Sequence, residues 1–354
     1  MKVSVRIARH LCRTVFVETM QIPTRIADVA TDVLVDADLR GIDSHGIQVL
    51  PYYIDRWSAG QIVVDSEPVV VSETPSTAVF DARQGVGHYA SLFAMDAAID
   101  RARKSGIGAA VVRQSTHNGA ISHYTVHAAR QGMIGVAVTS CAPHVAPHGG
   151  TEGLHGTNPI SYALPRSGSE AIVFDFSTGH SRAKLRKYAD RHGTVPEGRA
   201  LNVDGQPTTD PADLMSGWIL PVAGHVGFGL ALLVDGLTCG LGDAPIGRQI
   251  PLITETSAPY HGSFFAMAIS PDAFGGTDAF AARINELVHQ VDSHPSRDPS
   301  NPVRWPGQRG WDLRRQRLLE GIPISDTRWK SLIDDLKARG VELDPSFCGG
   351  SPPV

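Results

Sequence analysis

The pattern of apolar and polar positions changes along the chain, from helical spacing to strand-like runs and back. In the first 60 residues apolar side chains recur every three or four positions, most clearly between residues 26 and 37. The residues that form this stripe are Ile26, Val29, Ala30, Val33, Leu34 and Ala37. Thr24 is the expected N-cap of this helix and Gly41 its expected end. The first segment is therefore predicted to be helical, with the stripe facing a core.

Short runs rich in β-branched residues begin at Val69 and alternate with segments of helical spacing. The strand-like runs are 69–71, 77–80, 109–112, 134–138, 172–174 and 264–269, and the helical segments among them are 89–103 and 120–130. An amphipathic segment, a Pro- and Ser-rich linker and two polar helices follow, at 274–291, 293–302 and up to about 340. The tail from Pro345 is expected to be loose. The pattern predicts a mixed α/β middle followed by helices.

Composition narrows the class of protein. A chain of 354 residues predicts about two domains. Hydrophobic residues at 42% and charged residues at 19% are ordinary for a soluble globular protein. The balance of 32 basic and 36 acidic residues gives a net charge of -4, which does not indicate nucleic-acid binding. The densest basic run, Arg314-Arg315-Gln316-Arg317, is interpreted as an exposed helix face.

The four cysteines and the apolar runs bear on location. The cysteines are far apart and form no C-x-x-C motif, which disfavours a zinc knuckle and a disulfide scaffold and fits a reducing cytoplasm. His10 and Arg13 interrupt what would be the apolar core of a signal peptide. The most apolar stretch, 226–234, ends at Asp235, well short of the roughly 20 residues that cross a bilayer. We expect a cytoplasmic protein without a membrane span.

Two motifs suggest chemistry but have simpler interpretations. Gly85-Val86-Gly87-His88-Tyr89-Ala90 follows a strand-like run and matches G-x-G-x-x-A, yet Arg113 stands near the place where a Rossmann fold needs an acidic residue. A Gly-rich strand-to-helix turn is the favoured interpretation. His123 and His127 have the spacing of a metal-binding pair, but no third ligand follows from the pattern, so an exposed histidine pair and no metal are expected.

Two polar turns are better candidates for a site. Asp43-Ser44-His45-Gly46 follows the end of a predicted helix, and the imidazole of His45 can give and take protons near neutral pH, with Ser44 able to hydrogen-bond a ring nitrogen or a substrate. Ser115-Thr116-His117-Asn118-Gly119 lies between a predicted strand and a helix, where α/β proteins bind anions and substrates. Either histidine could instead be an ordinary loop residue.

These turns and the blocks after them resemble the malate/L-lactate dehydrogenase family that is distinct from the Rossmann-type enzymes of the same names. The further blocks are Gly132-Met133-Ile134-Gly135, Ala146-Pro147-His148-Gly149-Gly150, Gly156-Thr157-Asn158-Pro159, Phe174-Asp175, Pro207-Thr208-Thr209-Asp210-Pro211 and Gly227-Phe228-Gly229-Leu230. The resemblance spans most of the chain. It implies a non-Rossmann, sulfolactate-dehydrogenase-like α/β fold with a seven-stranded mixed sheet in residues 67–270, and a helical domain from residues 1–66 and 271–354.

The resemblance also implies a homodimer and a site. The catalytic residues would be Ser44, His45, His117 and Asp175, with His45 or His117 as the proton carrier. NAD or NADP would be held by Cys141, Asp175, Phe176, Ser177, Thr178, Gly227, Pro306, Gly307 and Gln308. The implied activity is hydride transfer between NAD(P) and a small 2-hydroxy or 2-oxo acid. Ureidoglycolate oxidation, cyclic imino acid reduction and a catalytically degenerate nucleotide-binding relative remain alternatives.

Three departures from the family pattern bear on that activity. Val49 stands where an arginine commonly binds the substrate carboxylate, which puts carboxylate recognition in doubt. Val226 stands where a lysine contacts the cofactor. The stretch 180–191 is more basic than usual, and its arginines and lysines could compensate for the missing lysine.

Overall fold

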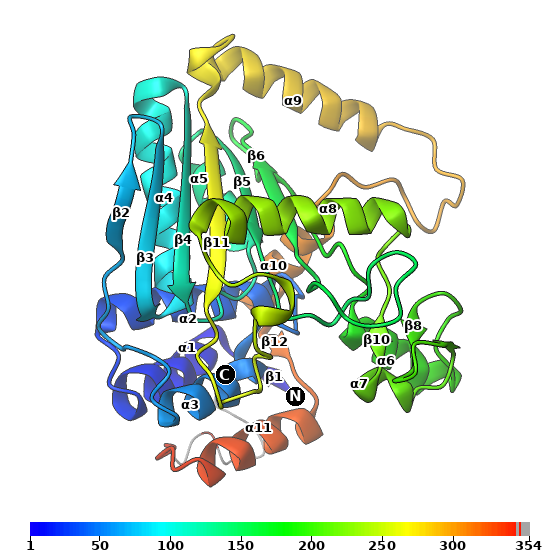
Figure 1. The fold of residues 1–354 in the computed structure, drawn as a ribbon. Helices are drawn as coiled ribbons and strands as arrows, with labels where there is room; N and C mark the ends of the chain where they lie inside the picture. The colour runs from blue at the N-terminus through cyan, green and yellow to red at the C-terminus, as the bar shows by residue number, and fades with distance from the viewer. Residues whose placement is uncertain (345–346, 348–354) are drawn as a thin grey trace.

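The computed structural model describes residues 1–344 and residue 347. Its centre is a seven-stranded sheet with the strand order β2-β3-β4-β11-β5-β6-β7 (Figure 1). Among these strands β3 and β4 pair in parallel and the other neighbours are antiparallel. The predicted α/β class with a seven-stranded mixed sheet is confirmed.

The strands are β1 Lys2–Val3, β2 Val69–Glu73, β3 Thr77–Gly85, β4 Ile107–Ser115, β5 Ile134–Thr139, β6 Ile160–Leu164, β7 Ile172–Phe176, β8 Ala200–Leu201, β9 Pro207–Thr208, β10 Trp218–Ile219, β11 Gly262–Ile269 and β12 Ile322–Pro323. The α-helices are α1 Val5–Arg13, α2 Thr24–Leu39, α3 Leu50–Ser58, α4 Gly87–Ser105, α5 Ser122–Arg130, α6 Arg182–His192, α7 Asp213–Ser216, α8 His225–Asp235, α9 Thr277–Asp292, α10 Gln308–Glu320 and α11 Asp326–Ala338. Shorter or wider helical turns are η1 Thr14–Thr19, η2 Ile47–Val49, η3 Gly236–Gly240, η4 Gly247–Gln249 and η5 Pro271–Ala273.

Helices cover both faces of the sheet. On one face α4 packs on β3, β4 and β11, and α5 packs on β5, β6 and β7. On the other face lie α8 and η3, which cross in front of the sheet in Figure 1. Strand residues alternate between these two layers, so that Val112 and Val111, neighbours on β4, belong to different apolar clusters. The central strands of the sheet are therefore packed on both faces.

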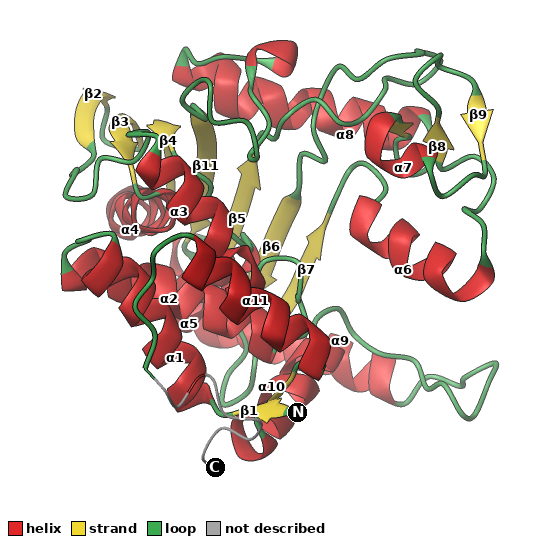
Figure 2. Ribbon diagram, turned by 90° about the horizontal axis from the view of Figure 1, so that it is seen from below, coloured by secondary structure: helices red, strands yellow, loops and turns green. Residues whose placement is uncertain are grey.

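Both ends of the chain contribute to one helical layer beneath the sheet. β1 pairs with β12, joining Lys2 to Pro323 and Val3 to Ile322. α1, α2 and α3 share a single apolar cluster with α11, which runs beside them in Figure 2. α2 also packs against α4, α5 and α10, and thereby connects this layer to the sheet.

Several expectations need correction. Thr24 is not the N-cap of α2, because it already belongs to the helix and extended Pro23 precedes it without a side-chain cap. β6 and α6 were not predicted from the spacing of apolar residues. Except for Phe347, the tail from Pro345 lies outside the described residues. Across the described part of the chain, no helix is both long and apolar enough to span a membrane.

Candidate active site

Several strand ends meet at one edge of the seven-stranded sheet. β4, β5 and β7 run in the same direction, because β11 lies antiparallel between β4 and β5, and β6 between β5 and β7. His117 follows β4, Cys141 follows β5 and Asp175 lies at the end of β7. These residues line a cavity of about 330 Å³, to which the Ser44-His45 turn also contributes. The fold thus gathers distant candidates around one space.

The turn that carries His45 is held by a buried carboxylate. Oδ2 of Asp38, at the end of α2, accepts a hydrogen bond from the backbone N–H of Ile47 at 2.9 Å. A Cβ at Gly46 would lie 1.8 Å from Oδ1 of Asp38, so only glycine fits there. Burial raises the pKa of Asp38 to about 7. Within the turn, the Oγ of Ser44 lies 2.8 Å from Nδ1 of His45.

The turn that carries His117 packs on the start of α4. A Cβ at Gly87 would lie 2.1 Å from the carbonyl oxygen of Thr116 and 2.6 Å from that of His117. The second glycine of the G-x-G-x-x-A match therefore allows a close approach of the protein's own backbone. The rings of His117 and His45 are stacked with centroids 5.7 Å apart and planes inclined by 21°.

The two imidazoles have different electrostatic surroundings. Burial lowers the pKa of His45, while the carboxylate of Asp175 acts in the opposite direction. Burial also holds the pKa of His117 well below its ordinary value, and there His45, His88 and Arg56 lower it further. The surroundings therefore favour the protonated form of His45 more than that of His117.

Asp175 is oriented by the start of α5. Its Oδ2 accepts the backbone N–H of Ser122 at 3.0 Å. The Oγ of Ser122 in turn accepts a hydrogen bond from Nη2 of Arg40 at 3.1 Å. This chain of contacts fixes the carboxylate at the carboxyl end of β7, facing the two histidines' cavity.

The predicted site residues divide into two groups. Those that line the cavity are Ser44, His45, His117, Cys141, Asp175, Phe176 and Ser177. Those that do not line it are Thr178, Gly227, Pro306, Gly307 and Gln308. A Cβ on Gly227 would lie 2.4 Å from the carbonyl oxygen of Thr178, so these two residues pack together. The carbonyl oxygen of Pro306 accepts a hydrogen bond from the backbone N–H of Val173 at 3.0 Å, so this turn lies against β7.

Three cations line the cavity: Lys184, Lys187 and Arg309. Lys187 lies 3.4 Å from the carboxylate of Asp43. The side chains of Lys184 and Arg309 form no ion pair with any described residue. Two positive groups are therefore available to an anionic ligand.

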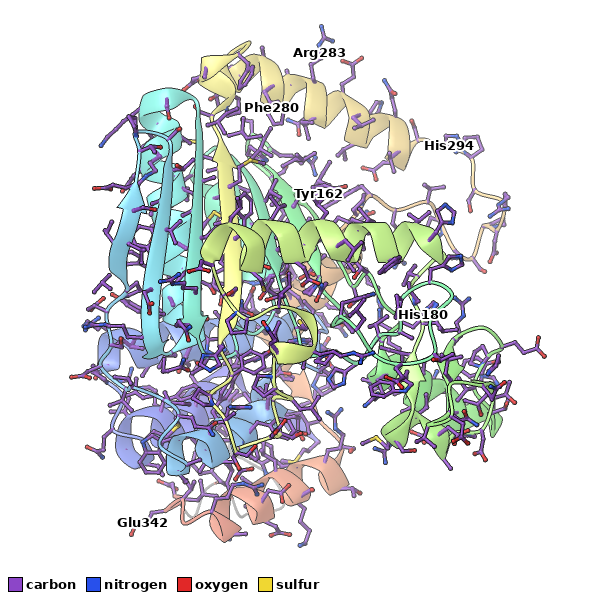
Figure 3. All side chains as sticks on the ribbon, in the orientation of Figure 1. Tyr162, His180, Phe280, Arg283, His294 and Glu342 are labelled. Carbon is purple, nitrogen blue, oxygen red and sulfur yellow. The ribbon has the colours of Figure 1, made fainter. Side chains whose placement is uncertain are left out.

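Of the three departures from the family pattern, Val49 and Val226 lie outside the cavity and the basic stretch contributes to it. Val49 is 8% exposed and belongs to the apolar core of the helical layer. Val226 is 49% exposed on α8. Most of the basic stretch forms α6, whose lysines reach the cavity. His180 lies between one end of α8 and a three-stranded sheet of order β10-β8-β9 (Figure 3). The basic residues near the cavity thus come from α6 and α10.

The structure corrects two further interpretations. His123 and His127 are half-buried rather than exposed, and they lie next to different carboxylates, Asp36 at 3.5 Å and Asp96 at 2.6 Å. Within residues 1–344 and 347, no cluster of three or more His, Cys, Asp or Glu is arranged to hold a metal. The basic run is not wholly an exposed face. Arg314 pairs with Asp36 at 3.2 Å, and Arg317 bonds the carbonyl oxygen of Asp38.

Sequence reasoning missed two residues next to the cavity, Tyr53 and His88. Both are almost completely buried, and the Tyr53 hydroxyl contacts the imidazoles of His88 and His117. The available signal was the position of His88, directly after Gly87 at the start of α4, which follows β3, a strand that points to the same edge as β4. Tyr53 lies in a helix and carries no comparable signal.

Comparison with known proteins places this site in a family. The family model described as malate/L-lactate dehydrogenase matches residues 3–333. The chain belongs to the malate/L-lactate dehydrogenase family. It is 32% identical to the L-sulfolactate dehydrogenase of Methanothermobacter thermautotrophicus over 326 residues, 92% of this chain and 94% of that protein. It is also 32% identical to the ureidoglycolate dehydrogenase (NAD(+)) of Escherichia coli K12 over 311 residues, 87% of this chain and 88% of that protein.

The fold comparison agrees with this membership. The structure of sulfolactate dehydrogenase from Methanocaldococcus jannaschii superimposes with a TM-score of 0.89 and 31% identity, covering 97% of this chain and 98% of that one. The resemblance to the malate/L-lactate dehydrogenase family and the sulfolactate-dehydrogenase-like fold are thus confirmed. The glycines at 85 and 87 belong to a strand-to-helix turn of this fold.

Proposed function

We propose that this protein transfers a hydride between NAD(P) and a small 2-hydroxy acid or its 2-oxo partner. The observation that carries the proposal is the pair of stacked imidazoles, His45 and His117, in one cavity with Asp175. Such a pair can bind the substrate oxygen and move a proton to or from it while the hydride is transferred at the attached carbon. The names of the relatives support the same class of reaction.

In this proposal the cavity residues have separate roles. His45 carries the proton, because Asp175 favours its cationic form. The Oγ of Ser44, 2.8 Å from Nδ1 of His45, orients that ring. His117 binds the substrate oxygen from the other side. Arg309 lines the same cavity and can hold the carboxylate, for which Val49 offers no positive charge.

The residues present fit a nicotinamide dinucleotide. The carboxamide needs both donors and acceptors, and Oε1 of Gln308 is a buried acceptor without a hydrogen-bond partner among the described residues. The phosphates need cations, and the unpaired Lys184 on α6 supplies one. The residues proposed to hold NAD or NADP are Cys141, Asp175, Phe176, Ser177, Thr178, Gly227, Pro306, Gly307 and Gln308. When bound, the nicotinamide supplies or accepts the hydride.

A homodimer in the cytoplasm is part of the proposal. The outer face of α8 and the following turn exposes large apolar side chains, with Val226 49%, Leu233 53% and Leu241 56% exposed. Several large apolar side chains exposed on one helix and the turn after it are typical of an interface, and a second copy of the chain would cover them. Cys12, Cys141 and Cys239 are free thiols, which fits a reducing compartment.

The experiment that tests the proposal measures binding and turnover separately. Thermal unfolding with NADH or NADPH detects binding, because a ligand at 100 times its dissociation constant adds about 2.7 kcal/mol of stability. Oxidation of the cofactor is then followed with a panel of 2-oxo acids, oxidised ureidoglycolate and cyclic imino acids. We expect binding, and turnover with a 2-oxo acid. Turnover of only the other substrates would select those alternatives, and binding without any turnover would indicate a degenerate relative.

A further inference from the structure

Three side chains form a hydrogen-bonded chain that runs from the cavity into the core. The hydroxyl of Tyr53, on α3, lies 2.8 Å from Nδ1 of His117 and 3.1 Å from Nε2 of His88. Tyr53 is 4% exposed and His88, in the first turn of α4, is 1% exposed. His117 lines the cavity, so the chain joins two nearly solvent-free groups to the site.

The neighbouring backbone fixes the direction of these hydrogen bonds. The N–H of Gly119 points at Nδ1 of His117 at 3.4 Å, so Nδ1 is an acceptor. The Tyr53 hydroxyl must then donate its proton to the same nitrogen, and its oxygen accepts the N–H of Nε2 of His88. The other nitrogen of His88, Nδ1, is buried without a partner among the described residues. In this arrangement Nδ1 of His88 is unprotonated, so the protein does not bury an N–H without an acceptor.

We propose that Tyr53 and His88 are positioning residues that hold His117 as the neutral tautomer with its proton on Nε2. His117 then donates a hydrogen bond from Nε2 to the substrate oxygen, and His45 transfers the proton. This division of roles rests on the proposed function, whereas the tautomer itself does not. No described residue hydrogen-bonds Nε2 of His117, so that nitrogen is left for a ligand in the cavity.

The surroundings of His117 support a neutral ring. Burial is the main cause of its strongly lowered pKa, and the groups that lower it further are His45, His88 and Arg56. The cations Lys184, Lys187 and Arg309 line the same cavity. The carboxylate of Asp175 raises the pKa of His45, whereas the charges that act on His117 lower its pKa. A neutral imidazole with a fixed N–H acts as a hydrogen-bond donor toward a carbonyl oxygen.

The tautomer can be read directly in the full-length protein without substrate or cofactor. Nitrogen-15 NMR of labelled histidines distinguishes a protonated from an unprotonated ring nitrogen, and the signals of His117 are identified by their loss in His117→Asn. We expect wild-type His117 to carry a proton on Nε2 and none on Nδ1 at neutral pH. A proton on Nδ1, or on both nitrogens, would overturn the proposal, and this result needs no variant of Tyr53 or His88.

Variants then test the positioning role. Tyr53→Phe removes the donor, so the two tautomers of His117 should mix and kcat should fall by roughly tenfold to a hundredfold, more than KM changes. Tyr124→Phe is the matched control: it also removes a buried tyrosine hydroxyl, which donates to the carbonyl oxygen of Asn118 at 2.5 Å and does not contact His117. It should leave the His117 signals as in the wild type.

His88 provides a rescue test. His88→Gln retains an N–H that can reach the Tyr53 oxygen and should keep the wild-type tautomer, whereas His88→Leu should broaden or shift the His117 signals. Wild-type signals and kcat in both Tyr53→Phe and His88→Leu would reject the positioning role. If the wild-type protein turns over none of the substrates, the proposed function fails, and the NMR result still decides the tautomer.

Discussion

At the scale of single residues, the two imidazoles of the cavity differ in the charge that faces them. His45 is influenced by the carboxylate of Asp175, and His117 by other groups that disfavour a cation. His45→Ala should therefore lower kcat by roughly 10² to 10⁴ while NAD(P)H binding changes little, because proton transfer is lost and the cofactor surface is kept. Steady-state kinetics and calorimetric titration measure the two effects. His289→Ala, an exposed histidine on α9, is the control, and an active His45→Ala would exclude His45 as the proton carrier.

The residue scale also shows how far the sequence could predict the site. His45 and His117 could be found because each lies in a polar turn next to a predicted element. That the two rings lie close together could not be predicted, because it depends on how the end of β4 meets the turn after α2. Tyr53 lacks a local signal and His88 has only its place after a glycine, because a buried hydroxyl or imidazole resembles an ordinary core residue until its partners are known.

At the scale of elements, the junction between α2 and the His45 turn has no spare room. Gly46→Ala would place a methyl group 1.8 Å from Oδ1 of Asp38, and the carboxylate cannot move without losing the N–H of Ile47. We expect a loss of about 2 to 4 kcal/mol in the free energy of unfolding, together with a strong loss of kcat, because the turn that carries His45 must shift. Urea denaturation and kinetics measure both.

A matched glycine separates this contact from a general effect of the substitution. At Gly275, in a loop, an added methyl group would have no other atom within 4 Å, and the backbone there is not left-handed. Gly275→Ala should therefore change stability by less than about 0.5 kcal/mol. Equal stability of Gly46→Ala and Gly275→Ala would show that the His45 turn can rearrange freely.

Elements with strong periodicity were predictable, and others were not. The stripe on α2, the β-branched runs of β4 and β5 and the apolar run of β11 identify those elements, because burial selects apolar residues. β6 has the sequence Ile-Ser-Tyr-Ala-Leu, whose small and polar residues give little indication of a strand. α6 is mostly charged, with only Leu185 and Ala189 buried, so its helical character has little apolar signal. Tertiary packing decides such elements.

At the scale of the whole molecule, the apolar outer face of α8 predicts an assembly. Leu233→Glu places a charge in the middle of that face and should convert a dimer into a monomer, because an interface does not tolerate an unpaired buried charge. Leu319→Glu is the control, since Leu319 is 89% exposed on α10, away from α8. Sedimentation velocity measures the mass. A wild-type monomer, or a dimer that persists in Leu233→Glu, would place the interface elsewhere or remove it.

The stability of the whole molecule should also depend on pH through His88. Burial is the main cause that lowers the pKa of His88 from 6.5 to about 3. The folded state therefore favours the neutral ring, and its contribution to stability is complete above pH 6.5 and declines as the pH falls toward 3. Asp38 acts in the opposite sense: its pKa rises from 3.8 to about 7, so its contribution is complete below 3.8 and is lost as the pH rises through 7. Because these two slopes oppose each other, the wild-type curve alone cannot isolate His88.

Comparing the pH dependence of stability between the wild type and a variant isolates the contribution of His88. Each pH unit between 6.5 and the lowered pKa changes the contribution of His88 by about 1.4 kcal/mol. His88→Gln has no titrating group, so from pH 7.5 to 4.5 the wild type should lose about 2 to 3 kcal/mol more of its free energy of unfolding than the variant does. Urea denaturation at both pH values gives this double difference, in which Asp38 and the other groups cancel. His289→Gln, which removes an exposed histidine, should run parallel to the wild type. A parallel curve for His88→Gln as well would mean that the folded protein protonates His88 as readily as the unfolded chain does, so that burial does not lower its pKa.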